Sequence, residues 1–147
     1  MTRNHLRDAV VGAIETAMAP YSPGAATLEL EGEPDDWLWV VRVLPRAKGA
    51  ADFTVSLATP SEDEVVLEFG RTHFFVIEDE PAELLRWVKR YCSAVAAGRF
   101  IEAGPKKDSY VRIWDEDGVE WGAGGVHLPW PWRWRGTRTY APYGPHE

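Results

Sequence analysis

The sequence predicts one α+β domain, residues 1–147, in which a mostly antiparallel sheet of about six to seven strands carries two helices, one N-terminal and one central, on one face. Three observations support this prediction. Two segments repeat apolar residues at helical spacing, short segments of β-type composition follow one another closely, and no linker or internal repeat divides the chain. A chain of 147 residues can bury a sizeable hydrophobic core without a disulfide or a metal.

Two helices are expected from apolar periodicity. From Leu6 to Met18 the apolar residues recur at intervals of three and four, and Pro20 ends this pattern because proline lacks the backbone donor that a helix needs. The second pattern runs from Leu84 to Val95. Pro81 suits the first turn of that helix, and Gly98 suits its C-terminal cap.

The β-type segments are short and are separated by residues typical of turns, which favours an antiparallel meander over parallel crossovers. Polar and apolar residues alternate in several of them, so each strand is expected to have one wet face. We interpret Gly122–Gly125 as a flexible loop and Asp117-Gly118 as the tight turn of a hairpin. The expected strands are Ala26–Glu31, Trp37–Leu44, Asp52–Ala58, Glu64–Phe69, Thr72–Ile77, Tyr110–Trp114 and Val119–Trp121.

The sequence contains no complete motif for catalysis or metal binding. The run that begins at Asp115 resembles the start of a calcium loop, but its sixth and twelfth positions hold Glu120 and Val126 instead of glycine and glutamate. The 4 histidines are not at ligand spacing, and Cys92 falls in the helical pattern, where a buried apolar role is typical. We therefore expect a protein that is not an enzyme, with no catalytic residues, no metal and no cofactor.

The charge balance restricts the partners. Net charge is −7, from 23 acidic and 16 basic residues, which argues against general adhesion to nucleic acid or to an anionic membrane and suits a basic protein partner. No apolar run has the length of a membrane span or of a secretory signal, and a single cysteine suits a reducing compartment. The expected location is the cytoplasm.

Acidic residues are concentrated in four runs. Such runs are often only solvated loops, but runs that meet at one end of the sheet would form a negative surface able to hold a basic protein. We expect the partner to bind acidic residues in three connections: Asp35, Asp36, Glu62, Asp63, Asp115, Glu116 and Asp117.

A Trp-rich segment near the C-terminus is the most unusual part of the sequence. Aromatic and guanidinium groups interleave there, and both are enriched where proteins bind partners. Alternate tryptophans on a strand also share one face, so these rings could equally cover the sheet. Both interpretations stay open for Trp130, Trp132, Arg133 and Trp134.

Two other functions compete with protein binding. The first is a small-ligand or carbohydrate-binding module built around Trp114, Trp121, Trp130 and His127, which requires a deep pocket lined by these residues. The second is nucleic-acid binding through Trp132–Arg135 and Arg138, which the negative net charge disfavours.

One stretch of the chain resembles a known family. Glu64–Phe75, an acidic link and the helix from Leu84 to Val95 together resemble small bacterial immunity proteins that neutralise polymorphic toxins. The resemblance implies a cytoplasmic, acidic inhibitor without enzymatic activity. The resulting hypothesis is a binding protein that blocks a toxin or effector protein through acidic loops, and the net charge favours a basic one.

Overall fold

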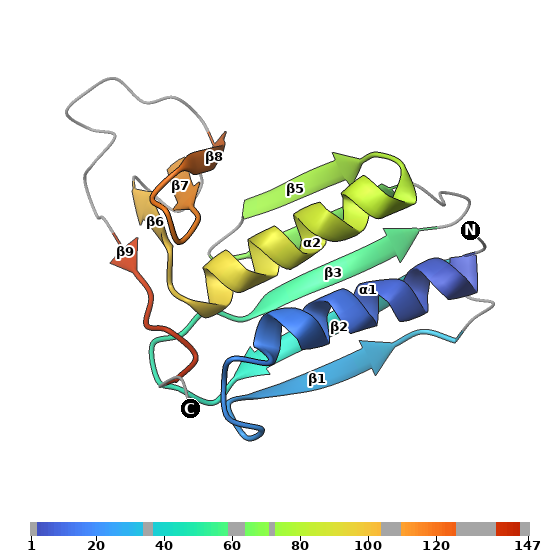
Figure 1. Ribbon diagram of the computed structural model, residues 1–147, viewed down its shortest axis with the longest axis horizontal. Helices are drawn as coiled ribbons and strands as arrows, with labels where there is room; N and C mark the ends of the chain where they lie inside the picture. The colour runs from blue at the N-terminus through green and yellow to red at the C-terminus, as the bar shows by residue number, and fades with distance from the viewer. Residues whose placement is uncertain are drawn as a thin grey trace.

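Two helices lie side by side on one face of a five-stranded antiparallel sheet, and a smaller sheet lies at one end of this layer (Figure 1). The computed structural model describes residues 3–33, 37–58, 64–70, 73–103, 110–125 and 138–144. Its helices are α1 (Arg3–Met18) and α2 (Pro81–Ala96), and its strands are β1 (Ala26–Glu31), β2 (Leu38–Pro45), β3 (Phe53–Ala58), β4 (Glu64–Phe69), β5 (His73–Glu78), β6 (Phe100–Ala103), β7 (Tyr110–Trp114), β8 (Glu120–Gly125) and β9 (Arg138–Thr139).

The large sheet is a meander in which each of β1 to β5 pairs with the next strand in the chain. Alternation divides its side chains between two faces. Val41, Val55 and Leu67 are buried beneath the helices, whereas Thr54 and Ser56 lie on the opposite side and are half-buried. We call this second side the open face of the sheet.

The small sheet has the order β8-β7-β6-β9 and is joined to the large one by aromatic packing. Phe100 of β6 lies edge-on against Phe69 of β4, with 5.1 Å between ring centroids, and stacks on Tyr140 at 4.6 Å. Such pairs stabilise a fold beyond the area that they bury. The core therefore continues from the helices into the small sheet.

The turn from α2 into β6 depends on glycine. Gly98 has φ +70°, and the N–H groups of Gly98 and Arg99 donate to the carbonyls of Val95 and Ala94. A Cβ at Gly98 would lie 2.5 Å from the backbone oxygen of Tyr140. The predicted C-terminal cap at Gly98 and the predicted place of Pro81 in the first turn are both confirmed.

The α+β class and the two helices on one face are confirmed, but the strands differ in number and grouping. They are divided between sheets of five and four, and β6 and β9 were not predicted. The interpretation of Gly122–Gly125 as a flexible loop is wrong, because these residues form most of β8 and pair with β7. The preceding hairpin turn brings them opposite β7, and backbone pairing needs no side chain.

Candidate functional site

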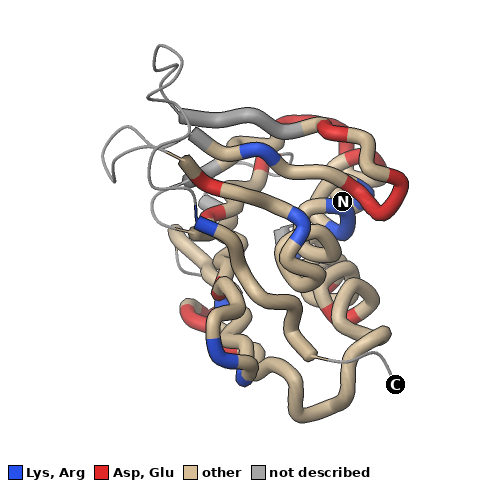
Figure 2. Tube along the Cα trace, turned by 90° about the vertical axis from the view of Figure 1, so that its left-hand side faces the viewer, with Lys and Arg blue, Asp and Glu red and all other residues tan. Residues whose placement is uncertain are grey.

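Most of the residues predicted to bind a partner lie outside the described residues: Asp35, Asp36, Glu62, Asp63, Trp130, Trp132, Arg133 and Trp134. The remaining three, Asp115, Glu116 and Asp117, form the turn between β7 and β8. Described acidic residues of three runs gather at one end of the large sheet, near the N-terminus, where β1 and β5 end and β4 begins, whereas the run at Asp115 lies in the small sheet (Figure 2). Two groups among the described acidic residues have different surroundings.

The first group lies on the open face and comes from strands, not from loops. The register places Glu29 of β1 opposite Arg42 of β2, Arg42 opposite Thr54, and Thr54 opposite Glu68 of β4. Directly paired residues share a face, so these side chains form one row across the sheet. Parallel rows add further carboxylates, and we call the whole set the open-face carboxylates: Glu29, Glu31, Glu64, Glu68 and Glu78.

Two glutamates of this group face each other directly. Glu64 of β4 pairs with Glu78 of β5 in the antiparallel register. The Cβ atoms of such a pair lie about 4.5–5.5 Å apart, and like charges at that position destabilise the sheet. The chain therefore keeps an unfavourable charge pair on a solvent-accessible face.

Little positive charge balances the open face. Arg42 is the one basic residue among its described strand positions, and its Nη2 lies 3.4 Å from Oε2 of Glu31, with both side chains about half exposed. Within the described part of the chain, Glu29, Glu64, Glu68 and Glu78 form no ion pair. These four carboxylates remain available to an external cation.

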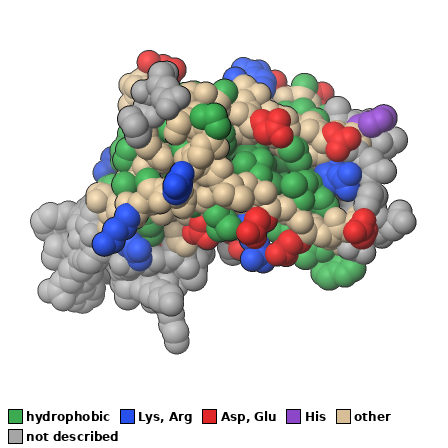
Figure 3. All heavy atoms as spheres, turned by 90° about the horizontal axis from the view of Figure 1, so that it is seen from below, with side chains coloured by type: hydrophobic (Ala, Val, Ile, Leu, Met, Phe, Trp, Pro, Cys, Tyr) green, Lys and Arg blue, Asp and Glu red, His purple; other side chains and the backbone are tan. Residues whose placement is uncertain are grey.

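The sheet edge next to this face is partly apolar. Leu30 of β1 is 55% exposed and Trp37 is 71% exposed. Seen from the β1 side, hydrophobic side chains gather in the middle of the surface with acidic and basic side chains around them (Figure 3). The edge therefore combines apolar surface with negative charge.

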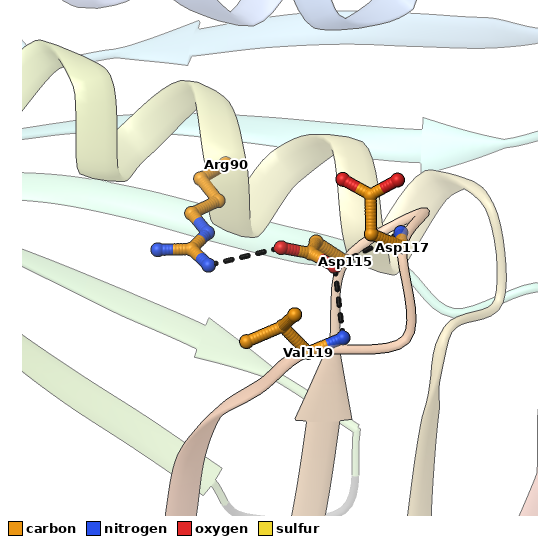
Figure 4. A network of polar contacts seen from close by, with 4 residues as sticks. All are labelled: Arg90, Asp115, Asp117 and Val119. Carbon is orange, nitrogen blue, oxygen red and sulfur yellow. Dashed lines mark hydrogen bonds and ion pairs between the residues drawn. The ribbon is translucent and has the colours of Figure 1, made fainter.

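The second acidic group is centred on Asp115 and serves the fold. Its Oδ1 accepts hydrogen bonds from the N–H groups of Asp117 at 3.0 Å and Val119 at 2.9 Å, and its Oδ2 accepts one from Arg90 at 3.1 Å (Figure 4). The N–H of Val119, the Arg90 guanidinium and the N–H of Asp117 together hold the pKa of Asp115 below its usual value. The predicted hairpin turn is confirmed, with Gly118 at φ +82°.

Arg90 connects this turn to α2 through two indole rings. Its guanidinium carbon lies 4.4 Å from the ring centroid of Trp121 and 5.1 Å from that of Trp87. Trp121 also lies edge-on to Tyr91 at 5.6 Å, and burial raises the pKa of the Tyr91 hydroxyl. Trp121, one residue of the predicted ligand pocket, is thus engaged in holding β8 against α2.

A shallow groove of about 350 Å³ lies beside this cluster, and its lining includes Arg99 and three basic side chains of α2. It has two carboxylates in its wall, those of Asp115 and Glu116. Neither Trp114 nor Trp121 lines it. His127 and Trp130, the other two residues of the predicted carbohydrate pocket, lie outside the described residues.

Glu102 of β6 is a buried carboxylate that sequence reasoning missed. It is fully buried and accepts a hydrogen bond from the hydroxyl of Tyr140. A Cβ at Gly70 would lie 2.7 Å from its Oε1, so the turn after β4 closes against this carboxylate. The one signal in the sequence for a buried carboxylate was a single acidic residue among apolar ones in Phe100–Ala103. We assign it a role in joining the two sheets.

Other predicted features can be placed. Cys92 is fully buried in α2, as predicted, and burial raises the pKa of its thiol. Among the described residues, no group of three histidine, cysteine or acidic side chains could hold a metal ion. In that same part of the chain, no helix is long and apolar enough to cross a membrane.

A scan against protein-family models and a search of curated protein sequences return no match to this chain. The geometry described above therefore carries the functional argument.

Proposed function

We propose that this chain is a non-enzymatic binding protein that holds a basic protein against the open face of its five-stranded sheet. In this proposal it acts as an immunity or inhibitor protein, because covering the active surface of a toxin or effector excludes the substrate. The observation that carries the proposal is the set of open-face carboxylates, four of which form no ion pair within the described residues.

The arrangement of these carboxylates suits a partner surface better than it suits the isolated fold. The paired glutamates Glu64 and Glu78 repel each other in the free protein, and a partner cation between them would remove that repulsion. Glu29 and Glu68 stand three strands apart, about 14 Å at normal strand spacing, so a partner must present several cations over a flat area. A protein surface does this more readily than a small ligand.

Charge also supports a fast encounter with such a partner. A net charge of −7 attracts basic proteins over a distance and repels phosphate backbones. Small polar residues, Thr54 and Ser56, occupy the middle of the face, so a partner can approach the sheet closely. This combination favours protein docking over nucleic-acid binding.

The proposal is tested by making the same double charge reversal in each of the two acidic groups. Glu64→Lys with Glu68→Lys reverses two open-face carboxylates, whereas Glu116→Lys with Asp117→Lys is the matched control on the exposed hairpin turn. Protein captured from extracts of the source cells by the wild-type chain should be retained by the control and lost by the open-face variant. Equal retention by both variants would contradict the proposal.

The inhibitory role needs its own measurement. The captured partner is expressed in a heterologous host, alone and together with each version of this chain. Partner expression should arrest growth, and co-expression of the wild type or the hairpin control should restore it, whereas the open-face variant should not. A partner that leaves growth unchanged when expressed alone would contradict the role as an immunity protein.

A further inference from the structure

Strand β1 is one edge of the five-stranded sheet, and no described strand lies beyond it. The N–H of Arg46 donates to the carbonyl of Ala25 at 2.8 Å. This hydrogen bond shows which residues of β1 direct their N–H and C=O groups toward β2 and which direct them away. In an antiparallel ladder the direction of the backbone groups alternates from residue to residue. The N–H and C=O groups of Ala26, Leu28 and Leu30 therefore point away from β2.

The side chains of β1 also alternate, between an apolar side and an acidic side. Leu28 and Leu30 pair with Val43 and Val41, so they lie on the helix side of the sheet, where Leu28 is half-buried and Leu30 is 55% exposed. Glu29 and Glu31 lie on the open face and are exposed. Each side of the edge thus offers a different chemistry to a neighbouring strand.

A hollow of about 310 Å³ continues the apolar side. It lies between the C-terminal end of α1 and β1, and Met18, Ala19, Ala26 and Leu28 form part of its wall. Strand β1 lies on the side of the molecule drawn in Figure 3. Apolar side chains of an added strand would find a partly formed site in the hollow.

We propose that β1 accepts an extended segment of the basic partner as an additional strand, and that this segment alternates apolar and basic residues. The inference rests on the proposed function, because it assigns the segment to the protein that the open face binds. Backbone hydrogen bonds to Leu28 and Leu30 provide affinity, and the two-residue alternation provides specificity. Apolar residues of the segment meet Leu30 and the hollow, while its lysines or arginines meet Glu29 and Glu31.

Charge selects a basic segment over a second copy of this chain. A dimer formed through two β1 edges would extend the same acidic face across both copies and bring their glutamates together. Acidic side chains on an edge strand also discourage pairing with other copies. A basic segment gains attraction from the same residues that disfavour self-association.

The test uses two synthetic peptides of identical composition and the complete chain labelled for NMR. The first is a capped seven-residue peptide that alternates lysine and valine, and the second has the four lysines followed by the three valines. The alternating peptide should bind about tenfold more tightly, which corresponds to about 1.4 kcal/mol. Its binding should shift the amide signals of Ala26, Leu28 and Leu30 and slow their hydrogen exchange.

Leu30→Pro provides the matched variant. It removes one outward N–H without removing a β1–β2 hydrogen bond, a position where edge strands accept proline. It should weaken the alternating peptide about fivefold or more, the cost expected for one backbone hydrogen bond. If Leu30→Pro does not fold, Glu29→Lys with Glu31→Lys serves instead and should abolish binding.

Three results would overturn strand addition: equal affinity for the two peptides, unchanged affinity in a folded variant, or dimerisation of the chain through β1 in sedimentation experiments. If the partner is still captured and still depends on Glu64 and Glu68, the docking role of the open face stands without β1. If the alternating peptide binds but no partner depends on Glu64 and Glu68, the strand site stands and the proposed function fails.

Discussion

The open face and the β7–β8 hairpin carry charge of the same sign but use it differently. On the hairpin, Asp115 binds Arg90 and two backbone N–H groups, and Glu120 is paired with Arg112. On the open face, Glu64 and Glu68 form no ion pair among the described residues, and Glu64 faces another glutamate. The first arrangement stabilises the fold, whereas the second leaves its charge for something outside the molecule.

An acidic run in a sequence can therefore either stabilise the fold or bind a partner. The sequence around Asp115 is as acidic as the sequence around Glu64, but the Asp115 carboxylate is held by the turn it belongs to. Buried or partnered carboxylates resist substitution, and exposed carboxylates without partners do not. Substitutions in the two groups should therefore affect stability and binding in opposite ways.

The largest effect on stability is expected at Glu102, the carboxylate most deeply enclosed by the fold. Glu102→Ala removes the acceptor of the Tyr140 hydroxyl and leaves a cavity between the sheets. We expect the free energy of unfolding to fall by roughly 2–4 kcal/mol in urea titrations. Glu68→Ala on the open face is the control and should change it by less than about 0.5 kcal/mol. Equal losses would contradict the structural role assigned to Glu102.

The next effect is expected at Arg90. Arg90→Ala removes the ion pair with Asp115 and the contacts with Trp87 and Trp121, at a cost of about 1–2 kcal/mol. Arg42→Ala removes only the exposed pair with Glu31, which is worth less than about 1 kcal/mol. Thermal unfolding measures both. A larger loss for Arg42→Ala would mean that the open face depends on its internal ion pair.

A pH dependence should test the stabilising role of the Asp115 charge. Its pKa is lower in the folded chain, so its contribution to stability is complete above the unfolded value of about 3.9 and is lost as the pH falls through the folded value. Asp115→Asn should therefore be less stable than the wild type at neutral pH, with a gap that narrows in acid. A gap that is constant with pH would contradict the role assigned to its charge.

The smallest effect is expected from relieving the repulsion between the paired glutamates. Glu78→Gln should stabilise the sheet by about 0.3 kcal/mol at low salt, because it removes a like charge opposite Glu64. The gain should vanish in high salt, where exposed charges are screened. Chemical denaturation at two salt concentrations measures the change. A loss of stability in the variant would mean that Glu78 has a stabilising partner.

Much of the fold could be predicted because its elements have strong periodicity. The bounds of β1 and β4 agree with the expected segments, and both helices lie where their apolar spacing placed them. The strand β6 could not be predicted, because four residues directly after a helix cap are too few to show an alternating pattern. Glycines weaken a strand pattern, so the Gly122–Gly125 part of β8 was predicted as a loop.

The site was harder to predict than the fold. The sequence predicts that Glu29 and Glu64 lie on strands and that Glu78 follows one, but only the register shows that the three side chains share one face. A shift of one residue would turn a strand over and send its carboxylates toward the helices. The sequence also predicted that Asp115 binds a partner. Its hydrogen bonds to Arg90 and Val119 could not be foreseen, because they depend on contacts that only the folded structure shows.

The central claim is that the open-face carboxylates serve a partner and that Asp115 in the hairpin serves the fold. The most direct measurement compares Glu68→Gln with Asp115→Asn, recording for each variant both the melting temperature and the affinity for the captured partner. The account predicts that Glu68→Gln weakens the partner and keeps the melting temperature, while Asp115→Asn does the reverse. Partner affinity that falls with Asp115→Asn and not with Glu68→Gln would contradict it.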